Sequence, residues 1–145
     1  MKLRLLAAAC VALLVANVDL LVKALVRSSE GFDHHRSGAW FLLSVVELAA
    51  MGAIALLPSR ALAVTAGLVA AGTLGNLVSA SGDGGTVANP FVVHFGDGGV
   101  AFNVADVAFV AGQLALTAAA MRLAVRHREK LPRNTIVVRL LRRVL

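Results

Sequence analysis

The sequence has few charged residues and only one cysteine, and both shortages exclude classes of protein. Asp, Glu, Lys and Arg make up 15% of its 145 residues, where soluble domains have about 25%. With 59% hydrophobic residues and a mean hydropathy of +0.82, the composition argues against a soluble globule. The lone Cys10 excludes an intramolecular disulfide and a cysteine-clustered metal site. No metal and no cofactor is expected.

Positive charge is concentrated at the C-terminal end of the chain. The sequence has 14 Lys and Arg against 8 acidic residues, and the basic residues cluster from Arg122 onward. Aromatic residues do not alternate with these charges, so a nucleic acid is not an expected partner. We therefore divide the chain into a membrane domain at 1–126 and a basic cytoplasmic tail at 127–145.

The end of this tail has a basic amphipathic pattern. One helical face carries apolar residues and the other carries arginines; the apolar residues are Val137, Leu140, Leu141 and Val144. Such a pattern is typical of an interfacial helix on anionic lipids. A disordered, positively charged topology determinant is the alternative.

Four apolar segments are long enough to cross a bilayer as helices, which takes about 20 residues each. They are Leu5 to Val26, Gly38 to Leu57, Ala61 to Val78 and Val100 to Ala124. The sequence therefore predicts an all-α membrane protein with four transmembrane helices. A signal peptide ending near Cys10 is the alternative for the first segment, but the apolar run continues far beyond that cysteine.

The positions of basic residues predict the orientation, because Lys and Arg near helix ends tend to stay in the cytoplasm. Lys2, Arg4 and the basic tail place both termini inside. The segment Ser79 to Gly99 has no Lys or Arg. We expect this segment outside, together with Arg27 to Ser37.

The outer segment between the third and fourth spans is predicted to be a short extended loop. Asp83 and Asp97 each begin an Asp-Gly-Gly turn signal, and the run 86–95 between them is rich in β-branched and aromatic residues. A phosphate-binding loop is the alternative for the glycines. However, this segment contains neither Gly-Lys-Ser nor Gly-Lys-Thr, and no helix is expected to begin directly after the glycines.

Ionisable residues at membrane depth are the first candidates for chemistry, because a charge at a helix centre costs about 2.5 to 3.5 kcal/mol on insertion scales. Asp19 and Lys23 lie four residues apart on one helical face, which favours a structural ion pair. Glu47 has no partner nearby in the sequence, and we assign it no role. Arg122 flanks the cytoplasmic end of the last span.

A polar cluster is predicted near the outer end of the last span. Asn103 and Asp106 lie three residues apart and share a helical face, and Asn76 closes the third span at the same level. Interhelical hydrogen bonds, worth about 0.6 kcal/mol each, explain such a cluster without any function. Composition alone favours this structural interpretation.

These polar blocks resemble the signature of signal peptidase II, the lipoprotein signal peptidase family. The most specific similarity is Phe102-Asn103-Val104-Ala105-Asp106, preceded by Gly75-Asn76-Leu77 and a glycine-led extended stretch. Weaker similarities are the pair Asp19 and Lys23, with Leu20 in place of a Gln, and Arg36-Ser37-Gly38-Ala39-Trp40-Phe41. The resemblance covers nearly the whole chain. It implies a multi-pass protein of the bacterial inner membrane with both termini inside.

The resemblance also implies an activity and its residues. Members of the family are intramembrane aspartic peptidases that cut diacylglyceryl-modified prolipoproteins, so the implied partners are membrane lipids and lipidated prolipoprotein peptides. Asp106 matches one catalytic aspartate, and Asn76, Asn103 and Arg36 match substrate-binding positions. The second catalytic aspartate, in a Gly-x-Val-Val-Asp-Phe block, corresponds to Asn89.

The loss of this aspartate predicts an impaired enzyme. An amide cannot exchange a proton with water as a carboxyl does, so with Asn89 the acid and base roles of the dyad cannot alternate. The family's Asn-Leu-Ile-Asp-Arg block has also lost its Asp and Arg, which are Ser79 and Ala80 here. Asp83 or Asp97 is a candidate substitute for the missing carboxylate.

Three functions therefore stay open at the level of sequence. An active peptidase, a non-catalytic binder or regulator of lipoprotein precursors, and a purely structural four-helix membrane protein all fit the chain. The sequence does not indicate a protein partner.

Overall fold

The computed structural model describes residues 1–26, 34–96 and 98–128. The elements, in order, are α1 (Lys2–Leu25), β1 (His34–His35), α2 (Gly38–Leu56), α3 (Arg60–Gly82), β2 (Thr86–Val87), β3 (Phe91–Phe95), β4 (Gly98–Phe102) and α4 (Val104–Arg126). All four helices are long and apolar enough to cross a membrane, so the predicted fold class is confirmed. The amphipathic segment predicted in the basic tail lies outside the described residues.

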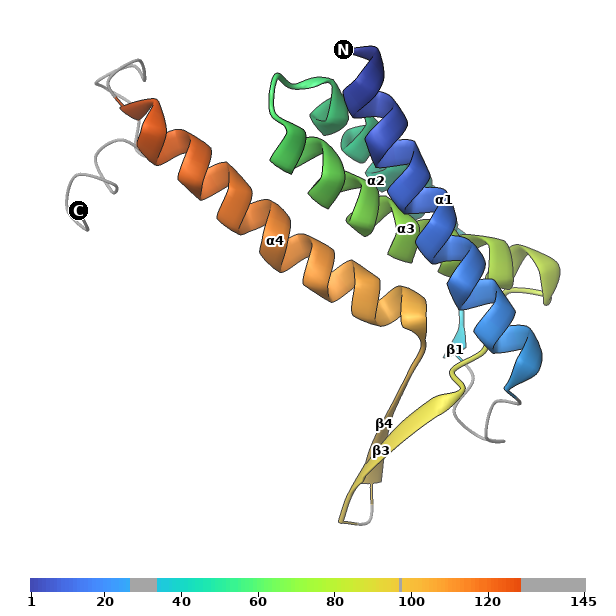
Figure 1. Cartoon of the computed structure of the whole chain (residues 1–145). Helices are drawn as coiled ribbons and strands as arrows, with labels where there is room; N and C mark the ends of the chain where they lie inside the picture. Colours follow the sequence, from blue (N-terminus) through green and yellow to red (C-terminus); the bar gives the residue numbers. More distant parts are fainter. Residues whose placement is uncertain (27–33, 97, 129–145) are drawn as a thin grey trace.

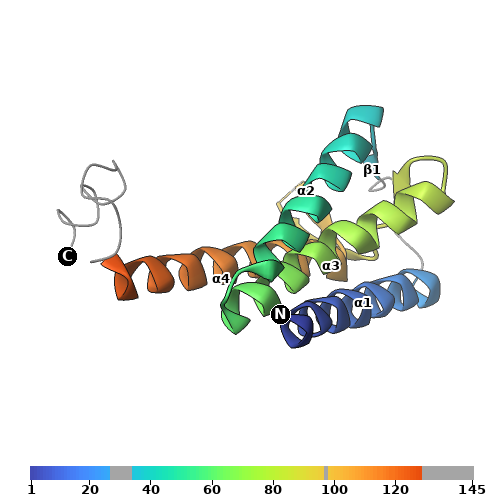
Figure 2. The same ribbon diagram turned by 90° about the horizontal axis from the view of Figure 1, so that it is seen from above.

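Helix α3 is the centre of the bundle, and α1, α2 and α4 all pack against it (Figures 1 and 2). In the most apolar 18-residue stretch of α3, 56% of the residues are buried, whereas in the corresponding stretch of each of the other helices 17% are buried. Glycines allow this close packing. A Cβ on Gly67 would lie 2.5 Å from the carbonyl oxygen of Ala8 in α1, and one on Gly72 equally close to that of Ala105 in α4. Small residues at such contacts let membrane helices approach closely.

The other three helices present large apolar side chains on their outer surfaces. Leu14 in α1 is 68% exposed, Leu43 in α2 is 66% exposed and Leu114 in α4 is 69% exposed. Monomeric soluble proteins rarely expose so continuous an apolar surface. These faces are suited to contact with lipid chains.

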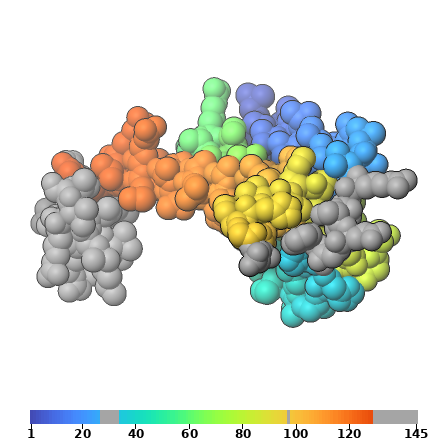
Figure 3. Space-filling model, turned by 90° about the horizontal axis from the view of Figure 1, so that it is seen from below, coloured from blue at the N-terminus to red at the C-terminus, as the bar shows by residue number. Residues whose placement is uncertain are grey.

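Strands β3 and β4 form an antiparallel hairpin that projects from one end of the bundle (Figure 1), with Phe91 paired to Phe102. Figure 3 shows this end of the molecule from below. Gly96 at the hairpin turn has φ +55°, a conformation that favours glycine. The predicted last span is wrong at its start: Val100 to Phe102 belong to β4, and α4 begins only at Val104. Pairing with β3 draws these residues out of the helix.

A second, smaller sheet lies at the same end of the bundle. His34 of β1 pairs with Val87 of β2, so the segment before α2 is held against the segment after α3. The turn that leads into β2 contains Gly84 at φ +58° and Gly85 at φ +95°. The first Asp-Gly-Gly signal therefore marks a true turn, and an extended loop follows it as predicted.

The chain ends agree with an even number of spans. Figure 1 shows the N-terminus and the end of α4 at the end of the bundle opposite the hairpin. Which end faces the cytoplasm stays a prediction.

Candidate functional site

Asp106 lies in the first turn of α4, where Asn103 caps the helix. The Asn103 side chain accepts a hydrogen bond from the Asp106 backbone N–H at 2.8 Å, and the Asp106 carboxylate accepts one from the Asn103 N–H at 3.2 Å. This reciprocal arrangement is a capping box. It fixes the direction of the carboxylate, and the positive end of the helix dipole favours the negative charge there.

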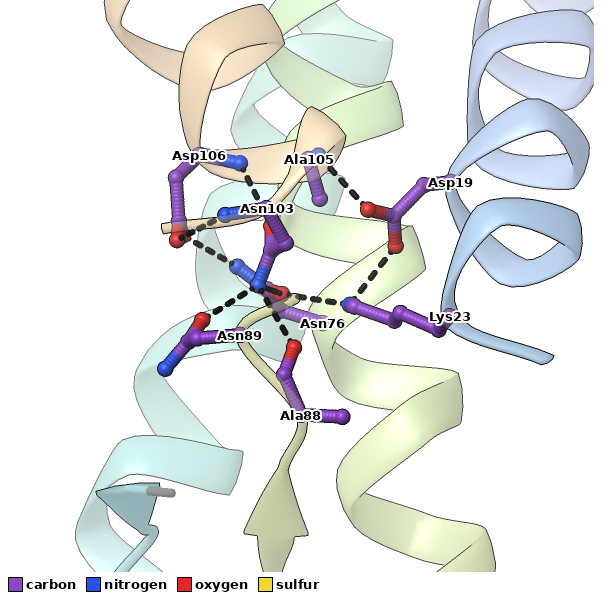
Figure 4. A network of polar contacts seen from close by, with 8 residues as sticks. All are labelled: Asp19, Lys23, Asn76, Ala88, Asn89, Asn103, Ala105 and Asp106. Carbon is purple, nitrogen blue, oxygen red and sulfur yellow. Dashed lines mark hydrogen bonds and ion pairs between the residues drawn. The ribbon is translucent and has the colours of Figure 1, made fainter. Parts of the chain in front are cut away.

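Asn76 of α3 connects this cap to Lys23 of α1 (Figure 4). Its amide nitrogen donates to Asp106 Oδ1 at 2.8 Å. Its amide oxygen accepts from Lys23 Nζ at 2.9 Å and from Asn103 Nδ2 at 3.0 Å. Asn76 is 7% exposed and Asn103 is fully buried. The structure thus brings Asn76, Asn103 and Asp106 together.

Asn89 joins the same network from the loop between β2 and β3. Its Oδ1 accepts from Asn103 Nδ2 at 2.8 Å, and its Nδ2 lies 2.9 Å from Nδ1 of His34. Because the cap fixes the Asn103 amide, the Asn89 nitrogen must point to the histidine. The contact therefore joins the Asn89 amide to the His34 ring. Asn103 stands between Asn89 and Asp106.

His34 is a site residue that the sequence did not indicate. Its contact with Asn89 depends on the pairing of β1 with β2, which brings together segments more than fifty positions apart. No local pattern in the sequence predicts this pairing.

Asp19 and Lys23 form an ion pair at 2.6 Å, with side chains 0% and 6% exposed. The second oxygen of Asp19 accepts from the backbone N–H of Ala105 at 2.8 Å, at the start of α4. A Cβ on Gly75 would lie 2.7 Å from the carboxylate. The pair therefore fastens α1 to the start of α4 and requires glycine on the adjacent turn of α3.

A polar pocket of about 210 Å³ opens beside Asp106. Residues of α2, α3 and α4 and the segment before α2 line it: Arg36, Trp40, Ser44, Glu47, Gly72, Thr73, Asn76, Asp106 and Phe109. The Arg36 guanidinium lies 5.0 Å from the centre of the Trp40 ring, a cation–π distance. Arg36 and Asp106, which the sequence related only through the resemblance, thus share one pocket.

An apolar groove of about 570 Å³ also includes Asp106 in its lining. The other lining residues come from β4 and α4 and are all apolar: Val100, Ala101, Phe102, Val107, Val110, Ala111 and Leu114. Asp106 is the residue common to the polar pocket and the groove.

Of the two carboxylates considered as substitutes for Asn89, the structure describes only Asp83. Asp83 is the exposed C-cap of α3 and lines neither the polar pocket nor the groove. Asp97 lies outside the described residues. In the described ranges, no three His, Cys, Asp or Glu residues are grouped as metal ligands.

Comparison with solved structures identifies the same fold in a bacterial membrane enzyme. One structure, obtained by the in meso method at 1.9 Å resolution, has a TM-score of 0.62 and 20% identity, over 78% of this chain and 91% of that chain. A second, at 2.3 Å, has a TM-score of 0.61 and 19% identity, over 79% and 87%. The sequence has no significant match to a protein-family model or to a curated protein. The fold is that of a multi-pass membrane protein.

Proposed function

We propose that this chain is a divergent member of the lipoprotein signal peptidase (signal peptidase II) family that binds diacylglyceryl-modified prolipoproteins. The proposal rests on one observation, the position of Asp106 in the lining of both an apolar groove and a polar pocket. A lipidated peptide has the matching composition, since its acyl chains and apolar segment suit the groove and its backbone amides suit the polar groups. The likeness to a bacterial membrane enzyme supports this proposal at the level of fold.

The arrangement of the polar groups also supports binding near Asp106. The capping box and Asn76 hold both carboxylate oxygens in fixed directions. Arg36 lines the same pocket and offers hydrogen-bond donors for a peptide carbonyl. A pre-arranged set of donors and acceptors lowers the cost of ordering a ligand.

The same geometry predicts that cleavage by the two-aspartate route is severely reduced. Asn89 occupies the position that the resemblance gives to the second aspartate, and its amide donates toward His34. It cannot supply a carboxyl proton, and each general acid or base contributes about 10² to 10⁴ in rate. Binding does not require that proton, so we expect binding to survive where fast cleavage does not.

Binding of a diacylglyceryl prolipoprotein peptide to the purified protein in nanodiscs tests this proposal. Val110→Trp puts a large ring into the groove, and Leu43→Trp puts the same ring on the exposed face of α2 as a matched control. We expect Val110→Trp to weaken binding at least tenfold and Leu43→Trp to leave it unchanged.

Two outcomes would contradict the proposal. In the first, the wild type would fail to bind the peptide, as a purely structural four-helix protein would. Alternatively, both tryptophan variants bind as tightly as the wild type, which would place the ligand elsewhere.

A further inference from the structure

Glu47 is the central residue of α2, and the structure gives it a position that its sequence context does not explain. Its carboxyl accepts hydrogen bonds from Thr73 Oγ1 at 3.0 Å and from Gln113 Nε2 at 3.3 Å. Both donors are neutral. Among the described residues, no basic side chain forms an ion pair with Glu47. An acidic residue kept at mid-helix in a membrane without a cationic partner is costly, and such residues commonly mark function.

Glu47 and Asp106 line the same polar pocket. Their hydrogen-bond partners on α3 are Thr73 and Asn76, which are three residues apart and hence separated by a rise of about 4.5 Å. Trp40, Ser44 and Glu47 recur at helical spacing along one face of α2, and the pocket follows this face. The two carboxyls therefore occupy successive levels of one pocket, with Glu47 farther from the hairpin.

The pocket has room for a reacting water between these levels. Its volume of about 210 Å³ exceeds several times the roughly 30 Å³ that one water occupies in the liquid. Carboxyl pairs that act on an intervening water, as in inverting glycosidases, are about 6.5 to 9.5 Å apart. Two carboxyls at successive levels of one pocket can act on a water between them in the same way.

We propose that Glu47 is the second functional carboxyl of this site and takes the acid role that Asn89 cannot perform. The inference rests on the proposed function, because it assumes a peptide bond next to Asp106. It replaces Asp83 as the candidate substitute, whereas Asp97 lies outside the described residues. Unlike Asp83, Glu47 lies in the pocket.

The proposed step is a balanced hydrolysis. The Asp106 carboxylate takes a proton from the pocket water, whose oxygen bonds to the peptide carbonyl carbon, while protonated Glu47 gives its proton to the carbonyl oxygen. The carbon–nitrogen bond then breaks, and the Asp106 proton passes to the leaving nitrogen. The hydroxyl formed from the carbonyl oxygen returns its proton to Glu47. One water and one peptide bond become a carboxylic acid and an amine, and both side chains are restored.

The test measures slow cleavage and binding of one diacylglyceryl prolipoprotein by wild type and variants in liposomes. Glu47→Gln keeps the size and the acceptor for Thr73 but loses the titratable proton. We expect it to lower cleavage about 100-fold or more, and the parallel binding measurement separates this loss of rate from any loss of affinity. Asp83→Asn removes a carboxyl outside the pocket and should cleave as the wild type does.

The dependence of cleavage on pH distinguishes an acid role from a structural one. Glu47→Asp retains a carboxyl and should keep both limbs of the wild-type profile at a lower rate. Glu47→Gln should lose the limb on which the rate falls as the pH rises, because no acid remains to be deprotonated. The other ionisable groups of the pocket, Asp106 and Arg36, are the same in both variants.

Two results would overturn the inference and leave the proposed function intact. In the first, the wild-type protein would bind the prolipoprotein but cleave it no faster than Asp106→Asn does. In the second, Glu47→Gln would cleave at the wild-type rate with an unchanged dependence on pH. Failure of the wild type to bind would instead refute the proposed function, and the inference with it.

Discussion

The buried ion pair between Lys23 and Asp19 should make the fold depend strongly on Lys23. Substitution by Met keeps most of the length of the side chain and removes the charge. Asp19 is fully buried, and in Lys23→Met it keeps the hydrogen bond from the Ala105 N–H but loses the ion-pair contact at 2.6 Å. Asn76 Oδ1 keeps its second donor, Asn103, so the main loss is at the carboxylate.

The magnitude follows from this uncompensated charge. Removal of one partner of a buried pair costs about 3 to 5 kcal/mol, whereas replacement of both partners by neutral groups is often close to neutral. We expect Lys23→Met to lower the free energy of unfolding by about 3 to 5 kcal/mol. The double variant Asp19→Asn/Lys23→Met should recover most of this loss, because Asn can still accept from the Ala105 N–H.

Unfolding in mixed micelles of mild detergent and dodecyl sulfate measures these differences. Leu25→Met, on an exposed position of the same helix, is the matched control and should unfold as the wild type does. The reasoning is refuted if Lys23→Met is as stable as this control. It is also refuted if the double variant is less stable than Lys23→Met alone.

The remaining predictions concern topology, catalysis and packing. In a Cys10→Ala background, a cysteine that replaces Gly98 should react with an impermeant reagent in intact cells and one that replaces Arg133 should not; the opposite pattern would mean an inverted orientation. Asn89→Asp should raise prolipoprotein cleavage only weakly in a purified-protein assay, because the residues that would orient a second aspartate are absent, and a fast Asn89→Asp enzyme would contradict this. Gly72→Ala should destabilise the protein, since its Cβ would lie 2.5 Å from a backbone oxygen of α4. Gly52→Ala meets nothing within 4 Å and should stabilise α2 by up to about 1 kcal/mol in the same unfolding assay, because Ala has the higher helix propensity.

The sequence by itself determined the features that depend on neighbouring residues. Apolar runs of membrane length identify the spans wherever they lie in the fold. Asn103 and Asp106, three residues apart, form the capping box, and Asp19 and Lys23, four apart, form the ion pair. The ion pair follows from helix geometry, which brings residues four apart onto one face, and the capping box joins an N-cap residue to the residue three positions later.

Only the tertiary structure decided which of these faces meet. Glu47 had no partner within reach along its own helix, and its donors Thr73 and Gln113 lie 26 and 66 residues away on α3 and α4. The contact of Asn89 with His34 spans 55 residues. Helix α4 begins at Val104 and not at the predicted Val100, because β4 pairs with β3. In each case the outcome depends on how the helices rotate against α3 and on strand pairing. The contacts between helices are set by the packing of small residues across the bundle, and the other contacts are set by strand pairing.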